Sequence, residues 1–104
     1  MIRKAFLMTL RPGCRQEYER RHNPIWPELE AVLKAHGVSN YSIFLQLESN
    51  QLFAYAEIES EASWLEIAHT EPCQRWWAHM KDLMLTNDDH SPAAIDLDEV
   101  FHLD

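Results

Sequence analysis

Tyr18 and His22 are the pair of residues whose types and spacing best suit chemistry. They stand four residues apart in a segment with helical periodicity, so their side chains are neighbours on one helix face. That face continues through Ile25, Leu29 and Val32 and is apolar. An imidazole gives and takes protons near neutral pH, and a phenol donates and accepts hydrogen bonds. The pair therefore suits proton transfer in a cavity; the alternative is a hydrogen-bonded core histidine beside a packed tyrosine ring.

A break in this helix is expected directly after His22. Pro24 and Pro27 lack the backbone N–H that a helix interior needs, and each disfavours helical geometry at the preceding residue. We expect Asn23 to cap a second helix that begins at Pro24. His22 would then lie at the junction of two helices, where its imidazole can point into a cavity.

Trp76 and Trp77 are a second candidate for chemistry. Adjacent residues point about 100° apart on a helix, so the two rings do not share one core position and one of them is free to line a cleft. Aromatic rings stack on the C–H faces of pyranose sugars, while tyrosine and histidine bond sugar hydroxyls. The combination is typical of a sugar site, although a stripe of Met and Trp also occurs in ordinary cores.

Several other kinds of site have no counterpart in the sequence. The six histidines form no H-x-x-x-H, H-x-H or H-E-x-x-H pattern, so we expect no metal site. A glycine-rich phosphate loop and a G-x-S-x-G motif are also missing, which argues against nucleotide binding and serine hydrolase chemistry. Cys14 and Cys73 are not in a C-x-x-C motif, and we interpret them as small buried apolar residues of a reduced protein.

Composition narrows the possible partners and compartments. The 104 residues suffice for one domain, 1–104, with 46% apolar and 25% charged residues. A formal charge of −8 repels nucleic acid and anionic membranes. The first apolar run is too short for a signal peptide, and no run reaches the roughly 18 apolar residues of a membrane span. We therefore expect a cytoplasmic protein that binds neither nucleic acid nor membranes.

Hydrophobic periodicity and turn residues predict the order β-α-β-β-α-β. Gly37 is expected to end the first helical region, and Ser60 to cap the next helix. The expected strands are 2–10, 38–47, 52–59 and 95–103, and the expected helices are 14–36 with its break, 60–69 and 72–85. The segment 86–92 is expected to be a polar loop.

This order indicates an α+β, ferredoxin-like fold with helices on one face of an antiparallel sheet. The strands carry apolar side chains on both faces, including Phe44, Phe53, Tyr55 and Phe101. A sheet face that no helix covers is most simply buried against a second copy. We therefore expect a symmetric dimer that packs sheet to sheet.

Several sequence motifs together resemble the L-rhamnose mutarotase family over nearly the whole chain. They are MIRKAF, EYERRHNPIWPELEAVLKAHG, NYSIFL, FAYAEIESE, CQRWW and the closing EVFHLD. Residues 65–71 and 86–95 lie outside these motifs, so the resemblance says nothing of their role.

The resemblance implies a homodimeric α/β barrel that interconverts the α and β anomers of L-rhamnose without a metal or organic cofactor. It implies that His22 is the proton donor and that Tyr18, Tyr41, Trp76 and Trp77 bind the sugar. The general base is not assigned, and neither is strictness toward other 6-deoxy or manno-configured sugars. Two other functions stay open on such a fold. One is a heme-degrading or quinol-type monooxygenase, and the other is a sugar-binding module without catalysis.

Overall fold

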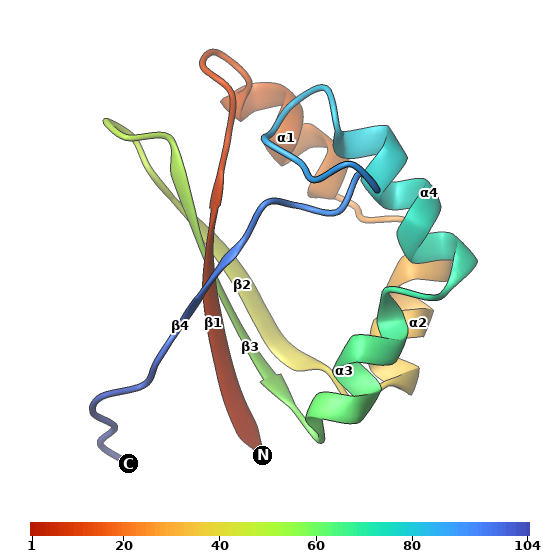
Figure 1. Cartoon of the computed structure of the whole chain (residues 1–104), viewed down its shortest axis with the longest axis vertical. Helices are drawn as coiled ribbons and strands as arrows, with labels where there is room; N and C mark the ends of the chain where they lie inside the picture. The colour runs from red at the N-terminus through yellow and green to blue at the C-terminus, as the bar shows by residue number, and fades with distance from the viewer.

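Four strands form one antiparallel sheet in the order β2-β3-β1-β4 (Figure 1). A computed structural model describes all 104 residues. The strands are β1 (Ile2–Thr9), β2 (Ser39–Gln46), β3 (Gln51–Ile58) and β4 (Ile95–Leu97). β1 lies at the centre and pairs with β3 along its whole length, from Ile2 opposite Ile58 to Thr9 opposite Gln51. This order confirms the predicted ferredoxin-like α+β fold.

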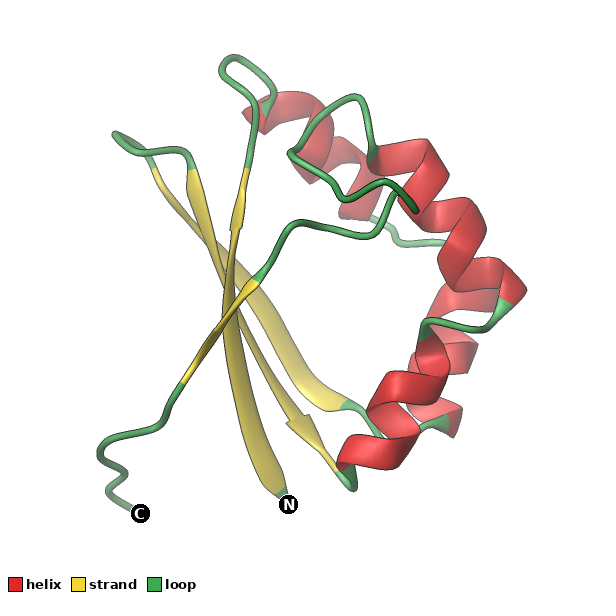
Figure 2. Cartoon of the chain, in the orientation of Figure 1, coloured by secondary structure: helices red, strands yellow, loops and turns green.

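All four helices lie on one face of the sheet (Figure 2). They are α1 (Arg15–His22), α2 (Pro27–Ala35), α3 (Glu61–Ile67) and α4 (Glu71–Met80). Ser60 caps α3 as predicted, because its hydroxyl oxygen accepts a hydrogen bond of 3.1 Å from the backbone N–H of Ser63. No helix has both the length and the apolar character that crossing a membrane requires. The other face of the sheet is left without helices.

The break after His22 is confirmed, but the predicted start of the second helix is wrong. The second helix begins at Pro27, and Trp26 has extended backbone angles, φ −57° and ψ 131°. Pro27 disfavours helical ψ at the residue before it, so a helix that started at Pro24 could not continue through Trp26. The segment from Asn23 to Trp26 is therefore a connection between two helices rather than a helix start.

The end of α4 also differs from the prediction, which extended this helix to Leu85. The helix stops at Met80, and the chain that follows pairs with the end of the first strand. The N–H of Arg11 donates to the carbonyl of Leu83 at 2.8 Å, and the N–H of Leu85 donates to Thr9 at 3.0 Å. The second bond takes the backbone N–H of Leu85, which a helix that continued to Leu85 would use.

The last strand is shorter than predicted. β4 ends at Leu97 rather than at Leu103, and it pairs with β1 only through Leu97 opposite Ala5, Asp96 opposite Phe6 and Ile95 opposite Leu7. The same register continued would place residue 100 opposite residue 2, where β1 begins. Residues 101–103 therefore have no partner strand in the chain, and their apolar side chains are exposed.

Gly37 ends the first helical region, as predicted. Its φ of +79° is a conformation that glycine adopts without strain. A Cβ at this position would lie 2.7 Å from Cγ of Glu59, so a larger residue would also meet the end of β3. The glycine thus allows α2 to turn directly into β2.

The core lies between the sheet and the helices, and it is unevenly filled. On the inner face of β3, Leu52 and Ile58 flank Ala54 and Ala56, and all four are at most 2% exposed. The cavity described next lies between this face of the sheet and the helices, and Leu52 is one of the residues that line it.

Candidate active site

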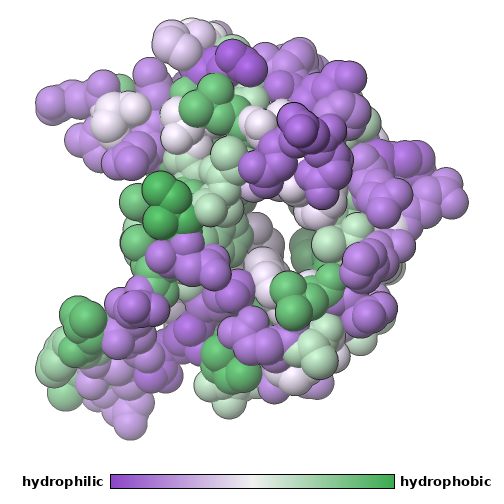
Figure 3. Space-filling view, viewed as in Figure 1, coloured by the Kyte–Doolittle hydropathy of each residue, from purple (hydrophilic) through white to green (hydrophobic).

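A cavity of about 1050 Å³ lies between the sheet and the helices. Figure 3 shows the hollow in the middle of the molecule. Its volume is at the upper end of the roughly 300–1,000 Å³ of small-molecule sites. The fold brings all five predicted site residues to its walls: Tyr18 and His22 on α1, Tyr41 on β2, and Trp76 and Trp77 on α4.

His22 is the last residue of α1 and is held by its own helix. Its Nδ1 lies 2.8 Å from the carbonyl oxygen of Tyr18. A carbonyl only accepts hydrogen bonds, so Nδ1 must carry the hydrogen. The neutral ring therefore has its lone pair on Nε2, which is left available to a ligand. Its ring also stacks on Tyr18, with centroids 4.3 Å apart, and meets Trp76 nearly at a right angle at 5.1 Å.

Burial changes the acid–base properties of this wall. It lowers the pKa of His22 from its ordinary value, an effect that the hydrogen bond to Tyr18 partly opposes. Burial also raises the pKa of Tyr18, with a smaller contribution from Tyr41, and it raises the pKa of Tyr41 itself. At neutral pH the site therefore holds a largely neutral imidazole and two protonated phenols.

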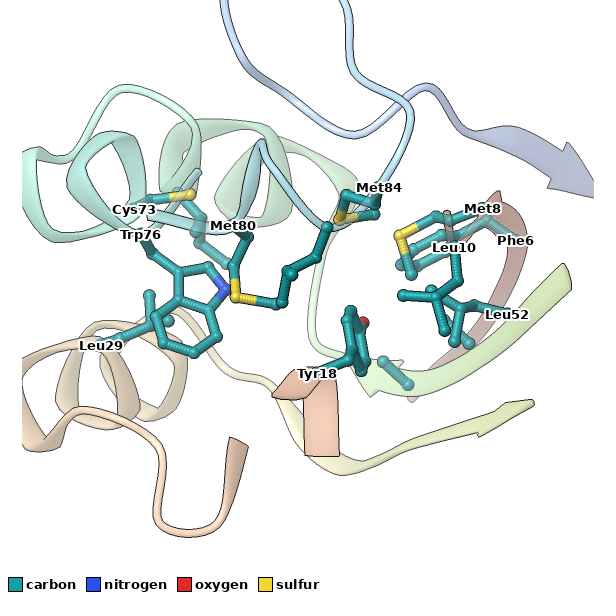
Figure 4. Close-up of a cluster of buried hydrophobic side chains, with 14 of the residues drawn as sticks. Phe6, Met8, Leu10, Tyr18, Leu29, Leu52, Cys73, Trp76, Met80 and Met84 are labelled. Carbon is teal, nitrogen blue, oxygen red and sulfur yellow. The ribbon is translucent and has the colours of Figure 1, made fainter. Parts of the chain in front are cut away.

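The two tryptophans have different surroundings. Trp76 is 8% exposed, and its ring is in contact with His22, Trp26 and His79 at centroid distances of 5.1, 5.1 and 5.7 Å. Figure 4 shows it extending from α4 into the buried cluster that also contains Tyr18. Trp77 is half-buried and has none of these aromatic neighbours. Trp76 therefore fixes the position of His22, and Trp77 has the more accessible ring.

A second aromatic group, which the sequence did not reveal, lies on the wall around Tyr41. The ring centroid of Tyr41 lies 6.5 Å from that of Phe6 on β1 and 6.1 Å from that of Trp64 on α3. Phe6 and Trp64 are themselves 6.0 Å apart, and both line the cavity together with Lys4. Strand alternation was the one sequence signal that could have found part of this group, because it places Lys4 on the same side of β1 as Phe6.

Ion pairs fix α1 against the end of α4. The guanidinium of Arg21 donates to Glu17 at 2.7 Å, to the carbonyl of His79 at 2.6 Å and to Asp82 at 3.0 Å. Hydrogen bonds from Arg20 and Arg21 lower the pKa of Glu17 to about 2. The turn that carries His22 is therefore tied to α4, which carries the tryptophans.

Residues 65–71 and 86–95, whose role the family resemblance leaves open, also contribute to the cavity. Leu65 and Ile67 line it from α3, and His90 and Ser91 line it from the loop before β4.

No three His, Cys, Asp or Glu side chains are grouped closely enough to hold a metal ion. Burial raises the pKa of Cys73 to about 11, so its thiol stays protonated at neutral pH.

Fold and cavity define a ferredoxin-like domain with a histidine and aromatic residues around a central hollow. A solved antibiotic biosynthesis monooxygenase shares this fold, with a TM-score of 0.63 over 96% of the chain and 99% of that protein. The two sequences are only 14% identical, so this likeness concerns the fold alone.

The sequence comparisons are more specific. The family model for L-rhamnose mutarotase matches residues 3–103. An L-rhamnose mutarotase of Opitutus terrae is 64% identical over the full length of both chains. The crystal structure of L-rhamnose mutarotase from Formosa agariphila is 42% identical and covers all of both chains, with a TM-score of 0.92. The chain belongs to the L-rhamnose mutarotase family.

Proposed function

We propose that the protein interconverts the α and β anomers of L-rhamnose by opening and closing the sugar ring. The observation that carries the proposal is His22, whose Nδ1 is held by Tyr18 and whose Nε2 is free, on the wall of an aromatic cavity. Membership of the mutarotase family supplies the substrate. The cavity's tyrosines and tryptophans supply hydroxyl groups and ring faces that suit a pyranose.

In the proposed mechanism, His22 carries one proton between two oxygens on the same sugar carbon. Nε2 of the neutral imidazole takes the proton from the anomeric hydroxyl, O1. The C1–O5 bond breaks as C1 and O1 form the carbonyl, and its electron pair goes to the ring oxygen O5. The imidazolium then donates the proton to O5, which gives the open-chain aldehyde and neutral His22. Rotation about C1–C2 and the reverse steps give the other anomer.

The proposal makes His22 a proton donor only after it has acted as a base. The lowered pKa of His22 favours this order, because little imidazolium is present at neutral pH before the substrate binds. It also supplies the base that the sequence left unassigned. Because only protons and the electrons of one C–O bond move, the reaction requires no metal or organic cofactor.

The proposed sugar contacts divide among the four aromatic residues. Tyr18 and Tyr41, kept protonated by their raised pKa values, donate hydrogen bonds to sugar oxygens. Trp77 offers a ring face to the apolar side of the pyranose, including its 6-methyl group. The ring of Trp76 is largely covered by its aromatic neighbours, so only its uncovered edge contacts the sugar. Its main role is to hold the imidazole of His22 in place.

Anomer exchange of L-rhamnose, followed by NMR saturation transfer between the two anomeric protons, tests the proposal. Mutarotation also occurs unaided in water, so the rate is compared with and without protein. We expect an increase proportional to protein concentration. Sugar binding without faster exchange would instead show a sugar-binding module without catalysis.

We also propose that two chains pack through the outer face of the sheet. Phe44, Phe53, Leu7 and Ile95 stand opposite one another across all four strands and form one apolar row. Phe44, Phe53 and Ile95 are 62%, 41% and 65% exposed. Figure 3 shows apolar groups exposed on the side of the molecule that the sheet forms. Burying such a row against its copy gives the homodimeric barrel.

Analytical ultracentrifugation at micromolar concentration tests the dimer. We expect twice the chain mass of 12.3 kDa. The substitution Phe53→Glu places a charge in the centre of the row and should shift the protein toward monomer. Leu65→Glu, at an exposed position on α3, should not change the mass. A wild-type monomer would contradict the proposal.

The proposed compartment is the cytoplasm. Cys14 and Cys73 are both unpaired in the fold, as thiols are in a reducing compartment.

A further inference from the structure

Lys4 occupies an unusual position for a lysine. It stands opposite Ala56, on the side of β1 that faces the helices, between Ile2 and Phe6. Its side chain is only 16% exposed. Lysine is seldom buried unless its ammonium group has partners, because burial removes water from the charge.

The fold gives this ammonium few partners. Nζ lies 3.3 Å from a carboxylate oxygen of Glu61, whose side chain is 54% exposed. It also lies 5.9 Å from the centroid of the Trp64 ring. An ammonium has three N–H donors, and Glu61 accepts only one. An ion pair with so exposed a carboxylate contributes little, so it does not by itself account for a half-buried lysine on the inner face of the sheet.

Lys4 is one of the residues that form the wall of the cavity. Lys4 lines it beside Phe6, Tyr41 and Trp64, whose rings are within 6.5 Å of one another. This group lies on β1, β2 and α3, whereas the proton carrier His22 lies on α1. Both residues line the same cavity, and we expect a sugar with C1 at His22 to present its other hydroxyls toward the group around Lys4.

We propose that Lys4 is a specificity-determining residue, whose ammonium donates a hydrogen bond to a ring hydroxyl remote from C1 while Tyr41 and Trp64 flank the sugar. The inference rests on the proposed sugar-binding function of the cavity. We expect this contact, remote from C1, to be made equally in the ground state and in the transition state, and a contact of that kind contributes to KM rather than to kcat. Loss of Lys4 should therefore raise KM and leave kcat nearly unchanged.

Lys4→Met tests this inference, because methionine keeps the apolar stem and removes the charge and the donors. We expect KM for L-rhamnose to rise about tenfold or more, as for a lost hydrogen bond to a charged group, and kcat to change by less than about threefold. Glu61→Gln is the control. It removes the charge of the ion pair but keeps Lys4, and it should leave KM within about twofold. Equal effects of the two substitutions would reduce Lys4 to a partner of Glu61 and overturn the proposal.

A binding measurement separates this proposal from the proposed catalysis. Methyl α-L-rhamnopyranoside has no free anomeric hydroxyl and cannot mutarotate, so calorimetry measures only its binding. We expect Lys4→Met to weaken this binding by a similar factor, whether or not the wild type accelerates exchange. Unchanged affinity would contradict the role of Lys4 and leave the catalytic proposal intact.

Deoxy analogues of the sugar provide a further test, whose first measurement uses the wild type alone. We expect the wild type to bind one of the 2-, 3- and 4-deoxy forms of the methyl glycoside about tenfold more weakly than the parent, and Lys4→Met to show no such preference. If removal of each hydroxyl in turn weakened wild-type binding by less than about threefold, no charged donor would contact any of them.

Discussion

The ends of α1 and α2 carry the same local arrangement, yet only one of them lies in the cavity. His22 donates from Nδ1 to the carbonyl four residues earlier at 2.8 Å, and His36 does the same at 2.7 Å. His22 packs on Tyr18 and Trp76 at the cavity wall, whereas His36 does not line the cavity. In both places the histidine satisfies a backbone carbonyl at the end of its helix, which is a structural role. Only the fold around His22 gives its second nitrogen access to a substrate.

Paired substitutions of the two histidines should give the largest contrast. His22→Asn keeps a hydrogen-bonding side chain but cannot carry a proton, so the protein-catalysed exchange rate should fall by roughly 10² to 10⁴ while the sugar still binds. His36→Asn removes the same helix-end arrangement outside the cavity and should change the exchange rate by less than about twofold. The measurement is anomer exchange at saturating L-rhamnose, with circular dichroism as the folding control. Near-normal catalysis by His22→Asn would make His22 a structural histidine like His36.

A matched pair of tryptophans should give a smaller contrast of the same kind. Trp77 and Trp26 are both half-buried, but only Trp77 lines the cavity. Trp77→Ala should weaken binding of the methyl rhamnoside by about tenfold, the size expected for losing one aromatic stacking contact. Trp26→Ala should lower the melting temperature without changing that affinity. If both substitutions lower stability and neither changes affinity, the two residues have the same structural role.

The contrast between the two histidines also shows which parts of the site the sequence could predict. Tyr18 with His22, and Trp76 with Trp77, are close in the chain, so helix geometry alone made them candidates. That geometry did not distinguish His22 from His36, because the surrounding cavity is made by distant segments. The proline break gave the one local difference, and its exact course depended on Trp26 being extended.

The wall around Tyr41 was harder to predict for the same reason. Phe6, Tyr41 and Trp64 come from three separate elements, and only the register of the sheet and the packing of α3 bring them together. The sheet order followed from the sequence of elements. The ends of α4 and β4 did not, since they depend on hydrogen bonds to β1 and on where β1 begins.

The pH dependence of anomer exchange tests most directly whether His22 starts the reaction as a neutral base. The rate at saturating L-rhamnose is measured by saturation transfer from about pH 5 to about pH 9, and the rate of His22→Asn is subtracted at each pH. Because the pKa of His22 is lowered from about 6.5, protonation should reduce the rate only below that pH. Above it the rate should be constant, since the pKa values of Tyr18 and Tyr41 are raised. A rate that rises as pH falls through this range would show that the imidazolium starts the reaction, which contradicts the proposed order of proton transfer.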